Sequence, residues 1–441
     1  MPSVGGETAL TNELQTRLYH RLNWRIMSWI IVIYLMDSID RTNLGFARSH
    51  ISQDVGLTAA QFGFAAGIFF VGLVLFEIPI SLWSSRVGAP KTFARIMVLW
   101  GMTSAATGFI HSRDSFYVLR FLLGVFEAGF APTCTYYLAR WYPENRMSAV
   151  IFWHQLSLPL AGIIIGPISG LILVHFDQVA GLAGWRWMFL LEGLPSILLG
   201  IIVAFVLPRA PKDARWLSAQ ERDMIETWSV RQNVRHVKFS AVVRDPAIYF
   251  LGLGFFALMA GMYMLNFWLP SIIHESGVHS SVAVGLYSSF PYVVSVASMA
   301  YWSARSDRLK ERSFHCYAPA VLASLCFLLT TVIPDIFVLK MIVLAGATAG
   351  IYASYVVFWA MAANVFQGSA ATGGFALINA IGLWGGVISP MVVGKLTSMT
   401  GTLSAGMLCM AVTVAFGALI LWSVTRRITA PSVSPVPSEI L

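Results

Sequence analysis

Long apolar runs recur along the whole sequence, and this recurrence restricts the folds that the chain can adopt. A helix needs about 20 mostly apolar residues to cross the hydrocarbon core of a bilayer. Twelve such runs lie at residues 24–46, 62–83, 93–110, 116–138, 148–174, 187–207, 247–269, 282–302, 316–333, 336–363, 372–396 and 403–424. Only 11% of the residues are charged, against about 25% in soluble domains. The sequence therefore predicts an all-α integral membrane protein with twelve transmembrane helices.

One long polar stretch, 208–246, divides these runs into two groups of six. The predicted parts are a tail (1–23), a six-helix bundle (24–207), a central loop (208–246), a second bundle (247–424) and a second tail (425–441). Within the loop, Ser218 followed by Glu221 fits a capping box, which predicts a short surface helix. Two bundles of six helices are typical of transporters whose halves are related by an axis along the membrane normal.

The positions of the basic residues indicate the orientation in the membrane. Lysine and arginine are enriched in short cytoplasmic loops, and a cytoplasmic N-terminus places 22 of the 29 basic residues in inside segments. We therefore expect a multi-pass protein of the cell membrane with both termini cytoplasmic. Because these loops explain the net charge of +8 and no array of aromatic and basic side chains is found, we predict no nucleic-acid partner.

Five ionisable residues lie inside two of the apolar runs. They are Asp37, Asp40 and Arg41 in the first run, and Arg120 and Glu127 in the fourth. A charge at the centre of a membrane helix costs roughly 2.5 to 3.5 kcal/mol on translocon scales, and such charges usually pair and mark a transport pathway. The sequence predicts a transporter with a charged site at mid-membrane. The structural alternative is that these charges only neutralise one another and join the two helices.

Helical spacing brings several of these side chains onto shared faces. Tyr34, Asp37 and Arg41 are spaced i, i+3 and i+7, and an ion pair between Asp37 and Arg41 is sterically available. Arg120 and Glu127 lie two turns apart, about 10 Å along the axis. We expect the three carboxylates to lie at similar depth and to face one central cavity.

Other polar residues inside the runs are weaker candidates for substrate binding. A lone polar side chain in a membrane helix more often hydrogen-bonds a neighbouring helix than contacts a substrate. Besides Tyr34, the predicted substrate-binding candidates are Gln155, Asn266, Trp359 and Asn379.

Two short basic loops resemble each other and a known signature. The loop SSRVGAPK at 84–91 and the loop SARSDR at 303–308 are similar to the two copies of the signature loop of the major facilitator superfamily. The second loop keeps the Asp-Arg pair, whereas the first has Ser85 where the superfamily commonly has Asp. The resemblance implies a cytoplasmic gate formed by Arg86, Asp307 and Arg308.

Further motifs resemble the anion:cation symporter family of that superfamily, which includes permeases for tartrate, phthalate, hydroxyphenylacetate and sugar acids. The motifs are DRTN at 40–43, FEIP at 76–79, RFLLGVFEAGF at 120–130, GWRW at 184–187, FLLEG at 189–193, FWLP at 267–270 and ALIN at 376–379. The resemblance implies uptake of an organic anion by proton symport, through alternating access of two bundles. It implies an anion clamp at Arg41 and proton coupling at Asp40 and Glu127. We expect Asp37 and Arg120 to be supporting charges.

Physical chemistry suits these implied roles. A planar guanidinium is well shaped for a bidentate contact with a carboxylate, and loss of water favours the protonated form of a carboxyl group. An ionised Asp40 beside Arg41 would compete with the substrate, so its protonation would free the guanidinium. Leu383 stands where the family often has Asn, and with Trp384 it suggests a less polar wall that suits an aromatic or short acid.

A drug/proton antiporter is the alternative function. The sequence GIIIGPISG at 162–170 is close to the glycine-proline motif of such antiporters, although packing of small residues between helices explains the same spacing. An enzyme is not predicted, because no nucleophile with a base, phosphate-binding glycine loop or HExxH motif is present. The four cysteines lack metal-ligand spacing. We expect no metal and no cofactor apart from the coupling proton, and a functional monomer.

Overall fold

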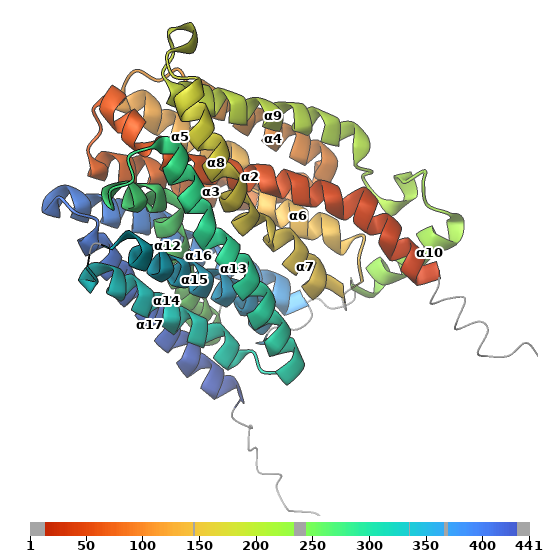
Figure 1. Cartoon of the computed structure of the whole chain (residues 1–441). Coiled ribbons are helices and arrows are strands. Elements are labelled where there is room, and N and C mark those ends of the chain that lie inside the picture. Colours follow the sequence, from red (N-terminus) through yellow and green to blue (C-terminus); the bar gives the residue numbers. More distant parts are fainter. Residues whose placement is uncertain (1–13, 144–145, 233–243, 335, 366–368, 430–441) are drawn as a thin grey trace, which may run out of the picture.

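The computed structural model describes residues 14–143, 146–232, 244–334, 336–365 and 369–429. In these ranges the regular structure is entirely helical (Figure 1), which confirms the predicted all-α fold. The spanning elements are α2 (Ser28–Val55), α3 (Ala59–Val87), α4 (Ala89–Thr107), α5 (Arg113–Glu127) with α6 (Phe130–Ala139), α7 (Met147–Gln155) with α8 (Ser157–His175), α9 (Gly184–Val206), α12 (Pro246–Glu275), α13 (Ser281–Leu309), α14 (Ser313–Val332), α15 (Phe337–Val365), α16 (Ser369–Thr400) and α17 (Ser404–Thr429).

The predicted third span corresponds to α4. Eleven described segments are long and apolar enough to cross a membrane, and α4 is not among them. It nevertheless lies side by side with α9 in the bundle (Figure 1). Its polarity comes from Lys91 and Arg95 near its start and from hydroxyl side chains, which are buried at Thr103, Ser104 and Thr107. These hydroxyls face protein rather than lipid, which allows a helix of this polarity to lie within the membrane. With α4 the bundle has twelve spans.

The first six spans contact the last six mainly along three pairs of helices: α3 with α16, α8 with α13, and α2 with α12. Glycine permits this close approach. A Cβ atom on Gly67 would lie 2.6 Å from the carbonyl oxygen of Val387, and one on Gly170 would lie 2.7 Å from that of Ser281. The glycines of 162–170 therefore pack α8 against α13, as expected for small residues between helices.

The start of α2 and the end of α17 lie at the same end of the bundle (Figure 1), which we call the termini end. Residues 1–13 and 430–441 of the predicted tails lie outside the described residues. Helix replaces the rest of both tails, since the first helical segment spans Leu14–Val55 and α17 continues to Thr429.

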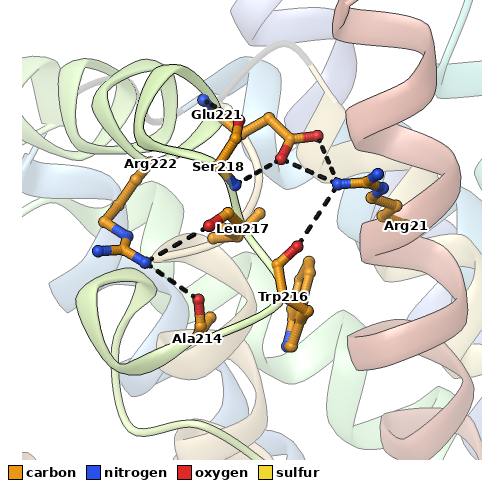
Figure 2. A network of polar contacts seen from close by, with 7 residues as sticks. All are labelled: Arg21, Ala214, Trp216, Leu217, Ser218, Glu221 and Arg222. Carbon is orange, nitrogen blue, oxygen red and sulfur yellow. Dashed lines mark hydrogen bonds and ion pairs between the residues drawn. The ribbon is translucent and has the colours of Figure 1, made fainter.

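The central loop is attached to the first span at the termini end (Figure 2). Ser218 and Glu221 form the predicted capping box, with the Ser218 N–H donating to Glu221 Oε2 at 2.8 Å and the Glu221 N–H donating to Ser218 Oγ at 3.2 Å. The box begins α10 (Ala219–Gln232), the predicted surface helix. Arg21 Nη1 donates to Glu221 Oε2 at 3.1 Å and to the Trp216 carbonyl at 3.4 Å. One carboxylate therefore both caps α10 and binds the first span.

Candidate functional site

A break in the fourth span positions the candidate site. Helix α5 ends at Glu127, and Gly129 adopts the left-handed conformation with φ of 78° before α6 begins. Glycine is the residue that adopts this conformation at little cost, and Pro132 in the first turn of α6 loses no helical hydrogen bond. The sequence therefore interrupts the helix next to its buried carboxylate.

A central cavity of about 50 Å³ lies beside this break, between the two halves. The first half contributes side chains of α2, α3, α5, α6 and α8, and the second half contributes side chains of α12, α15 and α16. The lining residues are Tyr34, Arg41, Leu73, Glu77, Glu127, Gly129, Phe130, Ala131, Pro132, Leu158, Met259, Met262, Tyr263, Tyr355, Asn379 and Leu383. Trp384 is absent from this wall and its side chain is 45% exposed.

Arg41 is the cation of the cavity and connects three helices. Its Nη2 lies 3.2 Å from Asp37 Oδ1 on α2, and its guanidinium forms an ion pair with Glu127 from α5. Nη1 donates to the Tyr263 hydroxyl of α12 at 3.4 Å. If both carboxylates are ionised, these side chains carry one net negative charge, which repels an anion. Protonation of one carboxylate makes the three side chains neutral together and frees N–H donors of the Arg41 guanidinium.

Asp40 lies apart from the cavity, contrary to the expectation that all three carboxylates share it. It accepts a hydrogen bond from Ser104 of α4 and does not line the cavity. Because Asp40 is one residue from Arg41, the helix turns it about 100° away from the guanidinium. Arg41 is paired by Asp37 and Glu127, so the expected competition of Asp40 for Arg41 is not what the structure shows.

Asp40 belongs to a second polar cluster inside the first half. Arg120 is fully buried, with its Cζ 4.9 Å from the centre of the Phe69 ring. Asn43 is a neighbour of both Asp40 and Glu192, and Glu192 Oε1 accepts a hydrogen bond from Ser169 at 3.0 Å. Asp40, Asn43, Arg120 and Glu192 each keep a buried polar atom without a hydrogen-bond partner in the described chain.

The other predicted binding residues have different partners. Asn379 Nδ2 donates to Glu77 Oε1 at 3.0 Å at the cavity wall, and this bond joins α16 to α3. Gln155 Oε1 accepts from the Tyr355 hydroxyl at 3.0 Å and joins α7 to α15.

Asn266 and Trp359 do not line the central cavity. Asn266 accepts from the Tyr292 and Tyr352 hydroxyls at 3.0 and 3.3 Å, so its amide oxygen is used inside the second half. Trp359 packs against aromatic rings, with 4.9 Å between its centroid and that of Phe255.

Comparison with known proteins identifies the family. The sequence model described as the Major Facilitator Superfamily matches residues 30–390. The chain belongs to this superfamily. It is 37% identical over 394 residues to a relative named as the metabolite transport protein NicT of Pseudomonas putida, covering 88% of this chain and 90% of the relative. It is 36% identical over 427 residues to a relative named as a tartrate transporter of Agrobacterium vitis, covering 96% and 93%.

A third relative of this Major Facilitator Superfamily transporter is named for drug resistance rather than for metabolite transport. A quinolone resistance transporter of Acinetobacter baumannii is 33% identical over 412 residues, covering 92% of this chain and 94% of the relative. Among solved structures, a bacterial homologue of the lysosomal transporter Spinster matches with a TM-score of 0.75 at 16% identity, covering 92% of this chain and 97% of that one. The fold and the membership confirm a multi-pass membrane transporter rather than an enzyme.

The predicted gate residues of this transporter are not in contact with one another. Asp307 forms an ion pair with Arg312 at 2.5 Å, whereas Arg308 is exposed at the end of α13. The Arg86 carbonyl accepts a hydrogen bond from Arg209 Nη2 at 3.2 Å, and the Arg86 side chain is exposed. In this conformation the second loop is therefore bound within its own half, and the first loop is bound to the start of the central loop.

Two polar cavity residues, Glu77 and Tyr355, were not predicted as binding residues. Pro79 follows Glu77 closely and is typical of a helix end, but α3 continues for ten residues beyond Glu77 to Val87. Tyr263 and Tyr355 also line the cavity. A signal for Tyr355 was present in the sequence, because it shares a helical face with Tyr352 at i, i+3 and with Trp359 at i, i+4.

Proposed function

We propose that this transporter imports a small organic anion together with a proton, by alternating access of its two halves. The observation that carries the proposal is the position of Arg41 at the cavity wall, where two buried carboxylates occupy its guanidinium. A substrate carboxylate can replace the Glu127 carboxylate when a proton neutralises Glu127. Binding of the anion and binding of the proton then favour each other.

The helix break supplies a second favourable feature for an anion. Gly129, Phe130 and Ala131 line the cavity at the start of α6. The N-terminus of a helix carries partial positive charge and unpaired N–H groups, and broken helices in transporters direct such ends at anionic substrate groups. Arg41 and this helix end therefore favour negative charge in the same small space.

The cavity wall restricts the class of anion. Tyr34 and Phe130 offer aromatic surface from the first half, and Met259, Met262 and Leu383 offer apolar surface from the second. We therefore propose a carboxylate such as an aromatic acid, a tartrate-like dicarboxylate or a sugar acid, with the apolar wall favouring the aromatic class. The relative named as a tartrate transporter supports a carboxylate substrate.

Asp40 is proposed as a second proton site, without direct contact with the substrate. It is buried and one of its oxygens lacks a hydrogen-bond partner in the described chain. Asp37 and Arg120 are proposed to support Arg41 and Asp40 electrostatically. The transporter would function as a monomer in the cell membrane with both termini cytoplasmic, and Arg86, Asp307 and Arg308 would meet when the termini end closes.

Transport by purified protein in liposomes tests this proposal. Labelled phthalate, tartrate and gluconate are offered with and without an inward proton gradient. The proposal expects accumulation of at least one acid above its outside concentration and loss of that accumulation on adding an uncoupler. Failure of all three acids to accumulate in response to the gradient would contradict it.

The quinolone resistance relative favours a second candidate, export of drugs in exchange for protons. This candidate predicts substrate movement in the opposite direction, because an inward proton gradient would expel a fluoroquinolone from loaded liposomes oriented like the cell. The same preparations therefore distinguish the two functions. The packing of 162–170 against α13 accounts for these glycines without invoking export, and we place anion import first.

A further inference from the structure

We propose that Arg48 forms an outer binding site for the transported anion, which the anion occupies before it reaches Arg41. The proposal rests on the proposed function and adds a site to it. Arg48 follows Arg41 by seven residues on α2, so the two side chains lie on one face, about 10 Å apart along the axis. Arg48 lies toward the end opposite the termini, which is the outer end in the proposed orientation.

A cavity larger than the central one surrounds Arg48. It has a volume of about 240 Å³ and lies where the ends of α2, α8 and α12 meet the start of α13. Its lining includes Arg48, His50, Ser49, Ser52, Ser271 and His274. Hydroxyl and imidazole groups around one guanidinium can supply the hydrogen bonds that hold a small carboxylate.

The guanidinium of Arg48 is fixed in orientation while its donors stay available. Its Cζ lies 4.0 Å from the centre of the Trp268 ring and 5.9 Å from that of Phe62. Stacking uses the face of the guanidinium and leaves the N–H groups at its edge. None of these N–H groups has an acceptor at hydrogen-bond distance in the described ranges, so the edge is free for a ligand.

Arg186 provides a comparison at the same end of the protein. It also stacks on a tryptophan, with its Cζ 4.5 Å from the centre of the Trp185 ring. Its Nη1, however, donates to the Gly108 carbonyl at 3.0 Å, and its Nε lies 4.0 Å from Asp54. Arg186 is therefore used within the fold, whereas Arg48 combines the same stacking with unused donors and an adjoining cavity.

The two cavities share no lining residue, and a layer of buried, closely packed residues lies next to Arg48. Phe62 and Trp268 are fully buried and meet edge to face with 6.0 Å between centroids. Below them, a Cβ atom on Gly45 would lie 2.5 Å from the Asn266 carbonyl oxygen, so α2 and α12 touch. An anion at Arg48 is thus bound on the outer side of this layer. Separation of α2 from α12 would open the path along the shared face to Arg41.

Glu275 opposes anion binding at this site. It lines the same cavity and interacts electrostatically with Arg48, without forming an ion pair in the described structure. Removing the negative charge of Glu275 should therefore raise the affinity of the outer site for the anion, whereas removing the positive charge of Arg48 should lower it. These opposite signs distinguish an anion site from a merely structural role, because structural damage would lower transport in both cases.

The test compares the two faces of the membrane. Uptake of labelled phthalate, tartrate and gluconate is measured in right-side-out and inside-out vesicles containing the full chain. Arg48→Gln should raise the outside KM about tenfold, the size expected for loss of one charge-assisted contact. It should change the inside KM less than the outside KM. Glu275→Gln should lower the outside KM. Arg113→Gln is the matched control, since it removes a positive charge at the same end outside the cavity.

The outcomes separate this proposal from the proposed function. An unchanged outside KM in Arg48→Gln, or equal changes on both faces, would overturn the outer site while gradient-driven uptake by the parent protein stands. Absence of gradient-driven uptake by the parent for all three acids would overturn the proposed function and, with it, the outer site. A raised outside KM in Trp268→Leu, with the Arg48 charge intact, would support orientation of the guanidinium by stacking.

Discussion

The guanidinium of Arg41 and the buried carboxylate of Glu127 form a largely buried ion pair that joins α2 to α5 at the wall of the central cavity. Removing one partner of a buried pair typically costs about 3–5 kcal/mol, because the remaining charge is left uncompensated. A proton on Glu127 creates this cost, and a substrate carboxylate relieves it. The pair thus gives a physical reason why proton and anion would travel together.

Replacement of Arg41 should abolish anion transport. Arg41→Ala leaves Asp37 and Glu127 as two carboxylates at a cavity without a cation, so binding of an anion should fall by at least about a hundredfold. Arg41→Lys keeps the charge but loses the planar fork, and should retain weak binding. Uptake and substrate-dependent thermal stabilisation measure both variants. Wild-type affinity in Arg41→Ala would exclude Arg41 as the anion ligand.

Glu77→Gln should increase affinity for an anion. The substitution preserves an acceptor for Asn379 Nδ2, which now lies 3.0 Å from Glu77 Oε1, and removes a negative charge from the cavity wall. The gain should be larger for a dicarboxylate than for a monocarboxylate, because Coulomb repulsion scales with ligand charge. Competition assays with phthalate and benzoate measure the ratio. A lower affinity for both acids would show that Glu77 helps binding in its charged form.

The helix break should require glycine at position 129. Gly129→Ala places a Cβ in a left-handed conformation, which costs about 1–2 kcal/mol, and 2.7 Å from Ile80 Cγ2. Gly56→Ala is a matched control, because Gly56 has φ of 71° and open space around its Cβ position. Thermal unfolding in detergent should show a larger loss of stability for Gly129→Ala. Equal losses would mean that Ile80 moves away without cost.

Much of the architecture follows from local sequence, because hydrophobic length and basic loops are properties of contiguous segments. The twelve spans, the capping box at Ser218 and the broad site around Arg41 could be predicted in this way. Helical spacing also placed Asp37 and Arg41 together correctly. Helical spacing did not predict that Asp40 lies outside the cavity. The side of α2 that faces α4 depends on packing against helices that are distant in the sequence.

The second half of the cavity was harder to predict for the same reason. Asn266, Trp359, Tyr263 and Tyr355 are all polar or amphipathic residues in apolar helices. The sequence alone does not determine which of these side chains point toward the first half. The structure shows that Asn266 is used by two tyrosines inside its own half. Glu77 was not among the predicted binding residues, since Pro79 close to it suggests a helix end, whereas α3 continues through Pro79.

The attachment of the central loop should depend on both roles of Glu221 (Figure 2). Glu221→Gln keeps an acceptor for the Ser218 N–H but weakens the ion pair with Arg21, whose side chain is 53% exposed. An exposed pair contributes about 0–1 kcal/mol, so this variant should change little. Glu221→Ala also removes half of the capping box, which adds about 1 kcal/mol. Limited proteolysis should cut the loop faster in Glu221→Ala, and equal rates in both variants would mean that the cap contributes nothing.

Proton coupling through Glu127 is tested most directly by Glu127→Gln, which imitates the protonated carboxyl group. In liposomes, the variant should still exchange labelled for unlabelled acid, because Arg41 remains available to the anion. It should fail to accumulate the acid in response to an inward proton gradient that drives accumulation by the parent protein. Full gradient-driven accumulation by Glu127→Gln would contradict the assignment of Glu127 as the coupling site.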